Sequence, residues 1–324
     1  MEKALERDRA LMSIFKHKVV RELAWAVGSC PLVKNSVHLP CCEESSCRSW
    51  LIEWTPRLKE LDEDPSALLN FVGCLTSKRL GDYFARLVEF WLLHRPDVIN
   101  LHANVQIKGE RTVGEFDFIY FSLREQRTMH WEVAVKYFLY YRDLRGTRLL
   151  GPNLKDSLQA KLGHLQERQL RLSLHSLAQS WLASQGLSDP KVEAFIKGYI
   201  FYPWGDLFCE MPKEIHPCHL RGWWAGYRSP DWDAWSKHII SLQESRWCIL
   251  PKSCWLTPQS WSSQDLFVLH TSNGLLQAIH DHFEEASNCL LIAQLEDCAG
   301  DWKEMSRGFI VGAHWPSAEP FESG

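Results

Sequence analysis

The period of the hydrophobic positions changes along this 324-residue chain. From residue 79 to 94, apolar side chains recur every three or four positions and Pro96 follows, which predicts an amphipathic helix. Three runs typical of strands come next, at 98–108, 111–121 and 129–139, and short polar turns separate them. Because consecutive strands joined by short turns usually pair, we expect an antiparallel meander.

A second helical segment follows the third predicted strand. Residues 153–183 carry a leucine stripe at helical spacing, and Asn153 is a plausible N-cap. The stripe consists of Leu158, Leu162, Leu165 and Leu172. Residues 194–202 form a fourth predicted strand, which Pro203 ends. A helix between the third and fourth strands is a crossover, so these two strands should be parallel in an otherwise antiparallel sheet.

The two ends of the chain have less regular patterns. Residues 1–27, including Leu5 and Leu11, predict an amphipathic helix, and residues 28–49 predict a loop. Beyond residue 205 a tryptophan-rich region shows a helix near 274–287 and hairpin-like runs near 288–296 and 306–315. We therefore expect an α/β fold, or α+β with a mixed sheet. Its predicted parts are an N-terminal helical extension and loop (1–76), a core (77–204) and a C-terminal α+β extension packed on the core (205–324).

Composition indicates a soluble intracellular protein. Hydrophobic residues make up 45% of the chain, and no segment approaches the ~18 uninterrupted apolar residues of a membrane span. Acidic residues such as Glu2, Glu6 and Asp8 fit neither a secretory signal nor a transit peptide. Eleven cysteines without paired spacing predict reduced thiols. We expect a cytoplasmic location with no membrane partner, and the oligomeric state stays open.

Acidic residues stand in the second and third predicted strands. The two runs read GEFDF over 114–118 and HWEVAVK over 130–136. Strand alternation puts Glu115 and Asp117 on one face of the second strand and Phe116 and Phe118 on the other. Two carboxylates on adjacent antiparallel strands, Asp117 and Glu132, can therefore meet on one side of the sheet.

On the third strand, alternation gives Glu132, Ala134 and Lys136 a common face. Buried carboxylates need a cation or a partner. Mg²⁺ uses one or two carboxylates together with substrate phosphate oxygens, so Asp117 and Glu132 would suffice as its protein ligands. Lys136 would orient the attacking water or neutralise developing charge. The alternative is a pair of ordinary strand carboxylates bound to Lys136 or Arg111.

This order of motifs resembles the PD-(D/E)xK nuclease superfamily: a helix, a Gly-Glu-x-Asp strand, a Glu-containing strand with a following lysine, a helix and a strand. More closely, residues 77–203 resemble a bacterial family called domain of unknown function 1853. The matching pieces read LGDYF (80–84), GEFDF (114–118), WEVAVK (131–136), GPN (151–153), GYIFYP (198–203) and GWW (222–224). The resemblance implies a restriction-endonuclease-like αβββαβ core.

The resemblance also implies an enzyme, a nuclease that hydrolyses phosphodiester bonds with Mg²⁺ or Mn²⁺ as cofactor. Its metal ligands carry over to Asp117 and Glu132. Many members of the superfamily add a glutamate from the first helix, and Glu89 is the candidate here.

One position departs from the superfamily pattern. The usual lysine lies two residues after the glutamate, where this chain has Ala134. Lys136 and Lys161, on the following helix, are the candidate replacements. Gln169 falls in the leucine stripe, so we expect it to steady the site or contact substrate.

Charge limits how nucleic acid could be bound. A formal net charge of -4 excludes a surface wholly committed to nucleic acid, but residues 136–171 hold eight basic and three acidic residues. They include Arg142, Arg145 and Arg148. We expect nucleic acid as the partner, with DNA favoured over RNA. The alternatives are an inactive nuclease-like protein that binds nucleic acid and a protein-interaction scaffold that uses the Trp-rich end.

Two other clusters contain residue types that bind metals. Cys209, His216, Cys218 and His219 lack the spacing of a zinc knuckle, so we interpret them as a structural set. Cys41, Cys42 and Cys47 have no matching second pair.

Overall fold

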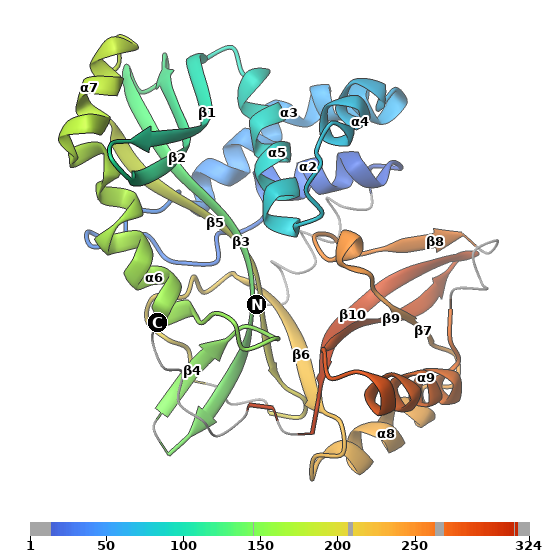
Figure 1. Cartoon of the computed structure of the whole chain (residues 1–324). Coiled ribbons are helices and arrows are strands. Elements are labelled where there is room, and N and C mark those ends of the chain that lie inside the picture. The colour runs from blue at the N-terminus through green and yellow to red at the C-terminus, as the bar shows by residue number, and fades with distance from the viewer. Residues whose placement is uncertain (1–13, 145, 207–209, 263–268, 314, 317–324) are drawn as a thin grey trace. The chain divides into compact units, whose positions relative to one another are not determined.

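The computed structural model describes residues 14–144, 146–206, 210–262, 269–313 and 315–316, which form a mixed α/β protein (Figure 1). The chain divides into two compact units. Among the described residues, unit 1 holds 14–136, 159–199 and 211–220, and unit 2 holds the rest. Two strands, β3 (Arg127–Asp143) and β5 (Lys191–Pro203), contribute to both units.

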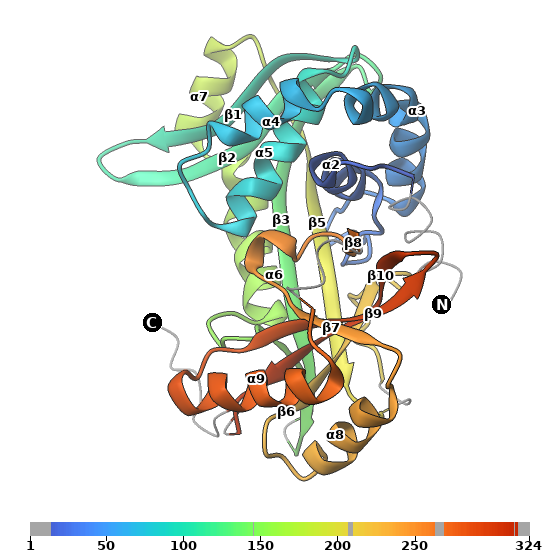
Figure 2. The same cartoon turned by 90° about the vertical axis from the view of Figure 1, so that its right-hand side faces the viewer.

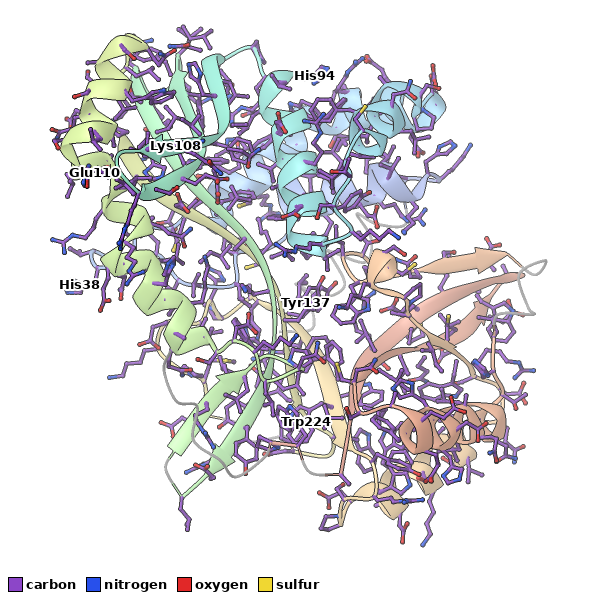
Figure 3. All side chains as sticks on the ribbon, viewed as in Figure 1. His38, His94, Lys108, Glu110, Tyr137 and Trp224 are labelled. Carbon is purple, nitrogen blue, oxygen red and sulfur yellow. The ribbon has the colours of Figure 1, made fainter. Side chains whose placement is uncertain are left out.

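Unit 1 contains helices and the strands of the predicted meander. Its helices are α2 (Lys18–Gly28), α3 (Glu44–Glu63), α4 (Ser66–Gly73), α5 (Leu80–Leu93), α6 (Leu158–Glu167), the 3-10 helix η1 (Gln169–Leu174) and α7 (Ser176–Ser184). Strands β1 (Val98–Lys108) and β2 (Thr112–Ser122) form a long antiparallel hairpin, and β2 pairs antiparallel with β3 (Figure 2). Lys108 and Glu110, labelled in Figure 3, mark the hairpin turn. The predicted meander is confirmed.

The crossover is confirmed as well. β5 lies beside β3. In unit 1, Trp131 stacks on Phe195 with ring centroids 5.0 Å apart, and in unit 2 Tyr140 contacts Tyr202 at 5.5 Å. Residue numbers rise together along both strands, so β3 and β5 run parallel.

Helices cover both faces of the strands in unit 1. On one face, Trp91 of α5 contacts Trp131, and Trp131 and Phe195 are almost fully buried. On the other face, α7 and η1 pack on β1 and β2 through a second apolar cluster. Its buried residues are Ile107, Phe116, Ile119, Leu172, Ala178, Leu182 and Leu187. α5 and α7 therefore lie on opposite sides of these strands (Figure 1).

Unit 2 holds the remaining strands of the sheet and a core of its own. Its elements are β4 (Gly146–Leu150), β6 (Leu220–Gly226), α8 (Trp232–Ser241), β7 (Arg246–Ile249), η2 (Lys252–Cys254), β8 (Ser260–Ser262), α9 (Ser272–Glu285), β9 (Leu290–Cys298) and β10 (Asp301–Val311). The hydrogen-bonded order is β4-β3-β5-β6-β10-β9-β7, with β8 beside β10. β10 is parallel to β6 and antiparallel to β9. Trp235, Trp247, Leu275 and Ile310 form its buried core, so these tryptophans serve apolar packing.

Two predicted elements differ from the structure. The helix expected over 153–183 is wrong: α6 begins at Leu158, and the helical path breaks at Arg168, with φ −123°, and again at His175, with ψ 135°. The leucine stripe is nevertheless buried, which is why one helix fitted the pattern. Asn153 is not a cap, because it stands in a turn five residues before α6.

The N-terminal part differs too. α2 covers the end of the helix expected over 1–27, whereas Leu5 and Leu11 lie outside the described residues. The loop expected over 28–49 ends early, because α3 begins at Glu44.

Gly198 tests the close contact of β3 and β5. Its φ is +144°, and a Cβ added there would overlap the carbonyl oxygen of Lys136 on β3. We expect Gly198→Ala to lower the free energy of unfolding by about 3 kcal/mol or more, since backbone must move. Gly163→Ala in α6, where a Cβ meets nothing within 4 Å, should instead stabilise by roughly 0.5–1 kcal/mol. Urea denaturation of both variants measures this difference, and equal midpoints would contradict it.

Candidate functional site

Asp117 and Glu132 occupy the place where β2 and β3 separate. The paired residues run from Ser122–Arg127 to Phe118–Trp131, one step before the two acids. The Val133 N–H donates to Asp117 Oδ2 at 2.7 Å. The Asp117 backbone N–H faces the Glu132 carboxylate and lowers its pKa. The Asp117 carboxylate thus takes a backbone hydrogen bond at the point where the ladder between β2 and β3 ends.

The regular alternation of β2 breaks at this point. Phe116 and Ile119, three residues apart, pack in the same apolar cluster, although a regular strand would put them on opposite faces. Residues 118 and 119 pair in regular register with β3. Phe116 and Phe118 therefore face opposite ways, and the expectation that they share a face is wrong. Asn104, across from Asp117 on β1, has φ 53°, a left-handed conformation that bends the hairpin here.

Glu132 is enclosed by protein donors. Its side chain is 1% exposed. Its Oε1 shares a hydrogen bond of 2.8 Å with His130 Nε2, and Gln169 Nε2 donates to its Oε2 at 2.5 Å. These contacts fix the Glu132 carboxylate from the strand on which it stands and from η1.

Lys161 extends this network from α6. Its Nζ donates to Gln169 Oε1 at 2.8 Å, so a chain of hydrogen bonds leads from Lys161 through Gln169 to Glu132. The positive charge of Lys161 also favours the ionised forms of Asp117 and Glu132, which lowers their pKa values against the larger, opposite effect of burial. Of the predicted site residues, Asp117, Glu132, Lys161 and Gln169 therefore come together.

Burial dominates the electrostatics of the acid pair. Loss of solvent and, as a smaller effect, the nearby charge of Glu132 together raise the pKa of Asp117 to about 7. Burial likewise raises the pKa of Glu132 to about 8, against the opposing effect of Lys161. Burial lowers the pKa of His130 to about 4, so the imidazole is uncharged at neutral pH. When both carboxylates are ionised, the single positive charge of Lys161 does not balance their two negative charges.

A polar cavity of about 470 Å³ opens beside Asp117. From the strands it is lined by Glu115, Asp117, Ala134 and Lys136, and from α5 by Asp82, Arg86 and Glu89. Glu89 thus faces the same cavity as Asp117, but its carboxylate forms an ion pair of 2.8 Å with Arg86. Within the described part of the chain, no third His, Cys, Asp or Glu ligand atom joins both Asp117 and Glu132 within 4.8 Å.

The basic residues of the predicted segment 136–171 lie on several different elements. Arg148 on β4 binds Asp143 at 2.5 Å across the β3–β4 hairpin, and its guanidinium lies 5.3 Å from the ring centroid of Tyr141. Arg145 lies outside the described residues. Arg142 pairs with Thr147 in the same hairpin, so this part of the basic segment is formed by strands.

His130 is a residue of the site that sequence reasoning did not select. It stands two positions before Glu132, so alternation gives the two side chains a common face. A histidine two residues from a strand carboxylate was the available signal. The hydrogen bond to Glu132 makes His130 a group that positions this carboxylate.

Comparison with known proteins gives one family. The model of the family described as Domain of unknown function (DUF1853) matches residues 21–311. No curated protein and no solved structure matches the chain. Among the described helices, none has the length and apolar character needed to cross a membrane.

The raised pKa values predict how stability changes with pH in a chelating buffer. A carboxyl group whose pKa is higher in the folded state stabilises the fold while protonated, and this contribution is lost as pH rises toward the folded pKa. Wild-type stability should therefore fall from about pH 6.5 to about pH 8.5, a window above the titration of His130. Glu132→Gln should flatten this decline, because it removes one acid and its repulsion of Asp117.

Thermal unfolding at several pH values in that window measures the slope. Glu110→Gln, in the exposed hairpin turn, is the matched control and should keep the wild-type slope. If Glu132→Gln showed the same slope as wild type, ionisation of the acid pair would not be the cause of the loss of stability.

Proposed function

We propose that this chain, which belongs to the DUF1853 family, is a metal-dependent nuclease of the PD-(D/E)xK type that hydrolyses phosphodiester bonds of nucleic acid. The observation that carries the proposal is the pair formed by the partly buried Asp117 and the buried Glu132 on neighbouring strands, with the Val133 N–H donating to Asp117. We infer DNA as the substrate in preference to RNA, as the superfamily resemblance suggests.

The acid pair fits a hard divalent cation. Each carboxylate has four lone-pair positions on its oxygens, of which the described donors fill one on Asp117 and two on Glu132. Mg²⁺ and Mn²⁺ prefer carboxylate oxygen and need only one or two such protein ligands. Asp117 and Glu132 would hold the ion, with Asp117 the more available ligand. When bound, it would supply Lewis-acid polarisation of the phosphate and a more acidic water.

The chain's own residues supply the remaining groups. Gln169 and His130 fix the orientation of Glu132, which keeps its carboxylate from rotating away from Asp117. Lys161 brings positive charge to the acid pair and is linked to Glu132 through the side chain of Gln169. In this proposal it takes the role of the superfamily lysine that Ala134 lacks.

Only part of the lining of the cavity beside Asp117 is suited to a phosphate backbone. Arg86 and Lys136 offer positive groups along its lining, and Glu115 and Glu89 add negative ones. Arg86 is already paired with Glu89, so a phosphate there would compete with a carboxylate. We propose that Lys136 contacts a substrate phosphate and that Lys161 acts at the acid pair.

Asp117→Asn tests the nuclease proposal. We expect wild-type protein with Mn²⁺ to cleave DNA, and Asp117→Asn to reduce the rate by at least about 100-fold through loss of a metal ligand. Cleavage of linear and circular DNA and of RNA measures activity, and calorimetric titration with Mn²⁺ measures binding. Glu110→Gln, purified identically, controls for contaminating nucleases. Cleavage by Asp117→Asn at the wild-type rate would remove the assignment.

The two lysines can be separated by substitution. Lys161→Met should lower the single-turnover rate at saturating DNA by about 10–100-fold, because it removes the charge beside the acids and the support of Gln169. Lys136→Met should mainly weaken DNA binding and reduce its dependence on salt. The opposite distribution of effects would assign the superfamily lysine role to Lys136.

Binding without cleavage is the second candidate. It is favoured by Ala134 at the superfamily lysine position and by the two side-chain partners, His130 and Gln169, that already occupy Glu132. Salt-dependent DNA binding by wild type, with no Mn²⁺ affinity and no cleavage, would select it.

A further inference from the structure

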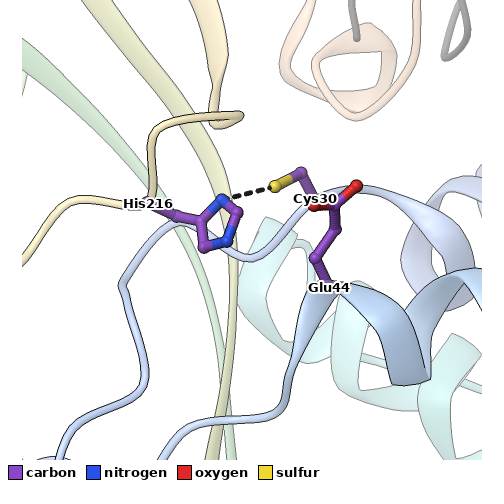
Figure 4. Close-up of side chains that lie close together, drawn as sticks. All are labelled: Cys30, Glu44 and His216. Carbon is purple, nitrogen blue, oxygen red and sulfur yellow. Dashed lines mark hydrogen bonds between the residues drawn. The ribbon is translucent and has the colours of Figure 1, made fainter.

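A second cluster of ligand-type side chains lies in unit 1, apart from the acid pair in sequence. Cys30, Glu44 and His216 bring one ligand atom each to within 4.8 Å of one another (Figure 4). The Cys30 Sγ and His216 Nδ1 atoms are 3.0 Å apart. Cys30 is 2% exposed, whereas Glu44 and His216 are half-buried.

Backbone pairing holds the cluster together. The His216 N–H donates to the Leu32 carbonyl at 3.0 Å, and the Lys34 N–H donates to the Glu214 carbonyl at 2.7 Å. An antiparallel bridge between Val33 and Ile215 lies between these bonds. The segment after α2 and the segment before β6 are thereby fixed in register, and Cys30 and His216 face each other as a result.

The imidazole of His216 presents a lone pair to the cluster. The Cys218 backbone N–H donates to His216 Nδ1 at 3.2 Å. Because a backbone N–H can only donate, Nδ1 must be unprotonated, and the thiol of Cys30 is then the donor to it. A neutral imidazole nitrogen directed at a cysteine sulfur is the form in which histidine binds a metal, and the single lone pair of Nδ1 would pass from the Cys30 and Cys218 donors to the ion.

The other nearby thiols are engaged elsewhere. Cys42 and Cys47 lie 3.3 Å apart, and the buried Lys197 ammonium donates to Cys47 at 3.2 Å. Neither joins the group formed by Cys30, Glu44 and His216. The ligand set is thus one sulfur, one nitrogen and one carboxylate oxygen.

We propose that Cys30, Glu44 and His216 bind one Zn²⁺ ion. Thiolate, imidazole and carboxylate are the three donor types that Zn²⁺ takes in proteins, at about 2.3 Å for sulfur and about 2.0–2.2 Å for nitrogen and oxygen. A tetrahedral ion with these bonds sets sulfur and nitrogen roughly 3.6 Å apart, so Cys30 and His216 need to separate by only about half an ångström. One thiolate and one carboxylate balance the charge of the dication.

The fourth position of this ion belongs to an exchangeable ligand. Three protein ligands leave one position of a tetrahedral zinc open, and the half-buried Glu44 and His216 leave it access to water. The ion would link the start of α3 and the end of α2 to the segment before β6. It is therefore a clamp on the N-terminal part of the chain as well as a site open to a small ligand.

Cobalt substitution tests the proposal on the full chain. The first equivalent of Co²⁺ added to chelator-treated protein should give tetrahedral absorption bands and a sulfur-to-cobalt charge-transfer band. Cys30→Ser should abolish the charge-transfer band, and His216→Gln should weaken Zn²⁺ binding by more than about 10-fold. Cys74→Ser and His238→Gln, both at exposed positions, are the matched controls and should bind as wild type does.

Two further measurements keep the test decisive if Cys30→Ser does not fold. Glu44→Gln keeps shape and removes only the carboxylate charge, so weaker Zn²⁺ binding with an unchanged circular dichroism spectrum would support the site. Asp117→Asn should keep full Zn²⁺ binding, which separates this site from the acid pair. Bound Co²⁺ without a thiolate band in wild type, or wild-type affinity in both His216→Gln and Glu44→Gln, would overturn the proposal.

Discussion

The candidate site depends on two carboxylates held close together where solvent is scarce. Asp117 accepts a hydrogen bond from the Val133 N–H beside Glu132, so its carboxylate cannot move without leaving that N–H group unpaired. Ionising both acids in this position is unfavourable, which is why burial raises their pKa values. The packing of the strands and helices fixes the positions of the two carboxylates. The positive charge of Lys161 lowers the cost of ionising them.

The surrounding fold fixes where β2 and β3 separate. On one side, Trp131 contacts Trp91 and Phe195, which anchors β3 at its last residue paired with β2. On the other, Phe116 packs with Leu172 of η1, which holds β2 before the bend. The two anchors straddle Asp117. Because dense apolar packing resists displacement, the separation of the strands, and with it the distance between the acids, is set by the core.

Sequence reasoning recovered the elements of this site better than its local geometry. The periodicity of 98–139 predicted β1, β2 and β3 within a few residues, and the crossover logic predicted that β5 is parallel to β3. Regular alternation failed at Asp117, because a strand can change face at a bend that no periodicity reports. The break between α6 and α7 was also invisible, because Leu172 of η1 is buried and keeps helical spacing with the buried leucines of α6. Contacts between distant segments, such as Gln169 with Glu132, had no local signal.

The two clusters of unit 1 differ in the chemistry that they offer to metals. Asp117 and Glu132 present only oxygen, which suits Mg²⁺ or Mn²⁺, whereas Cys30 and His216 present sulfur and nitrogen, which favour Zn²⁺. The sequence separated the ligands of the second cluster by up to 186 positions, so spacing rules for zinc motifs did not apply. Because affinity for Zn²⁺ generally exceeds affinity for Mn²⁺ at a given set of ligands, zinc would also reach the acid pair unless a stronger site holds it. A sulfur-containing site in the same unit would bind that zinc first and leave the oxygen pair to the weaker, more abundant ion.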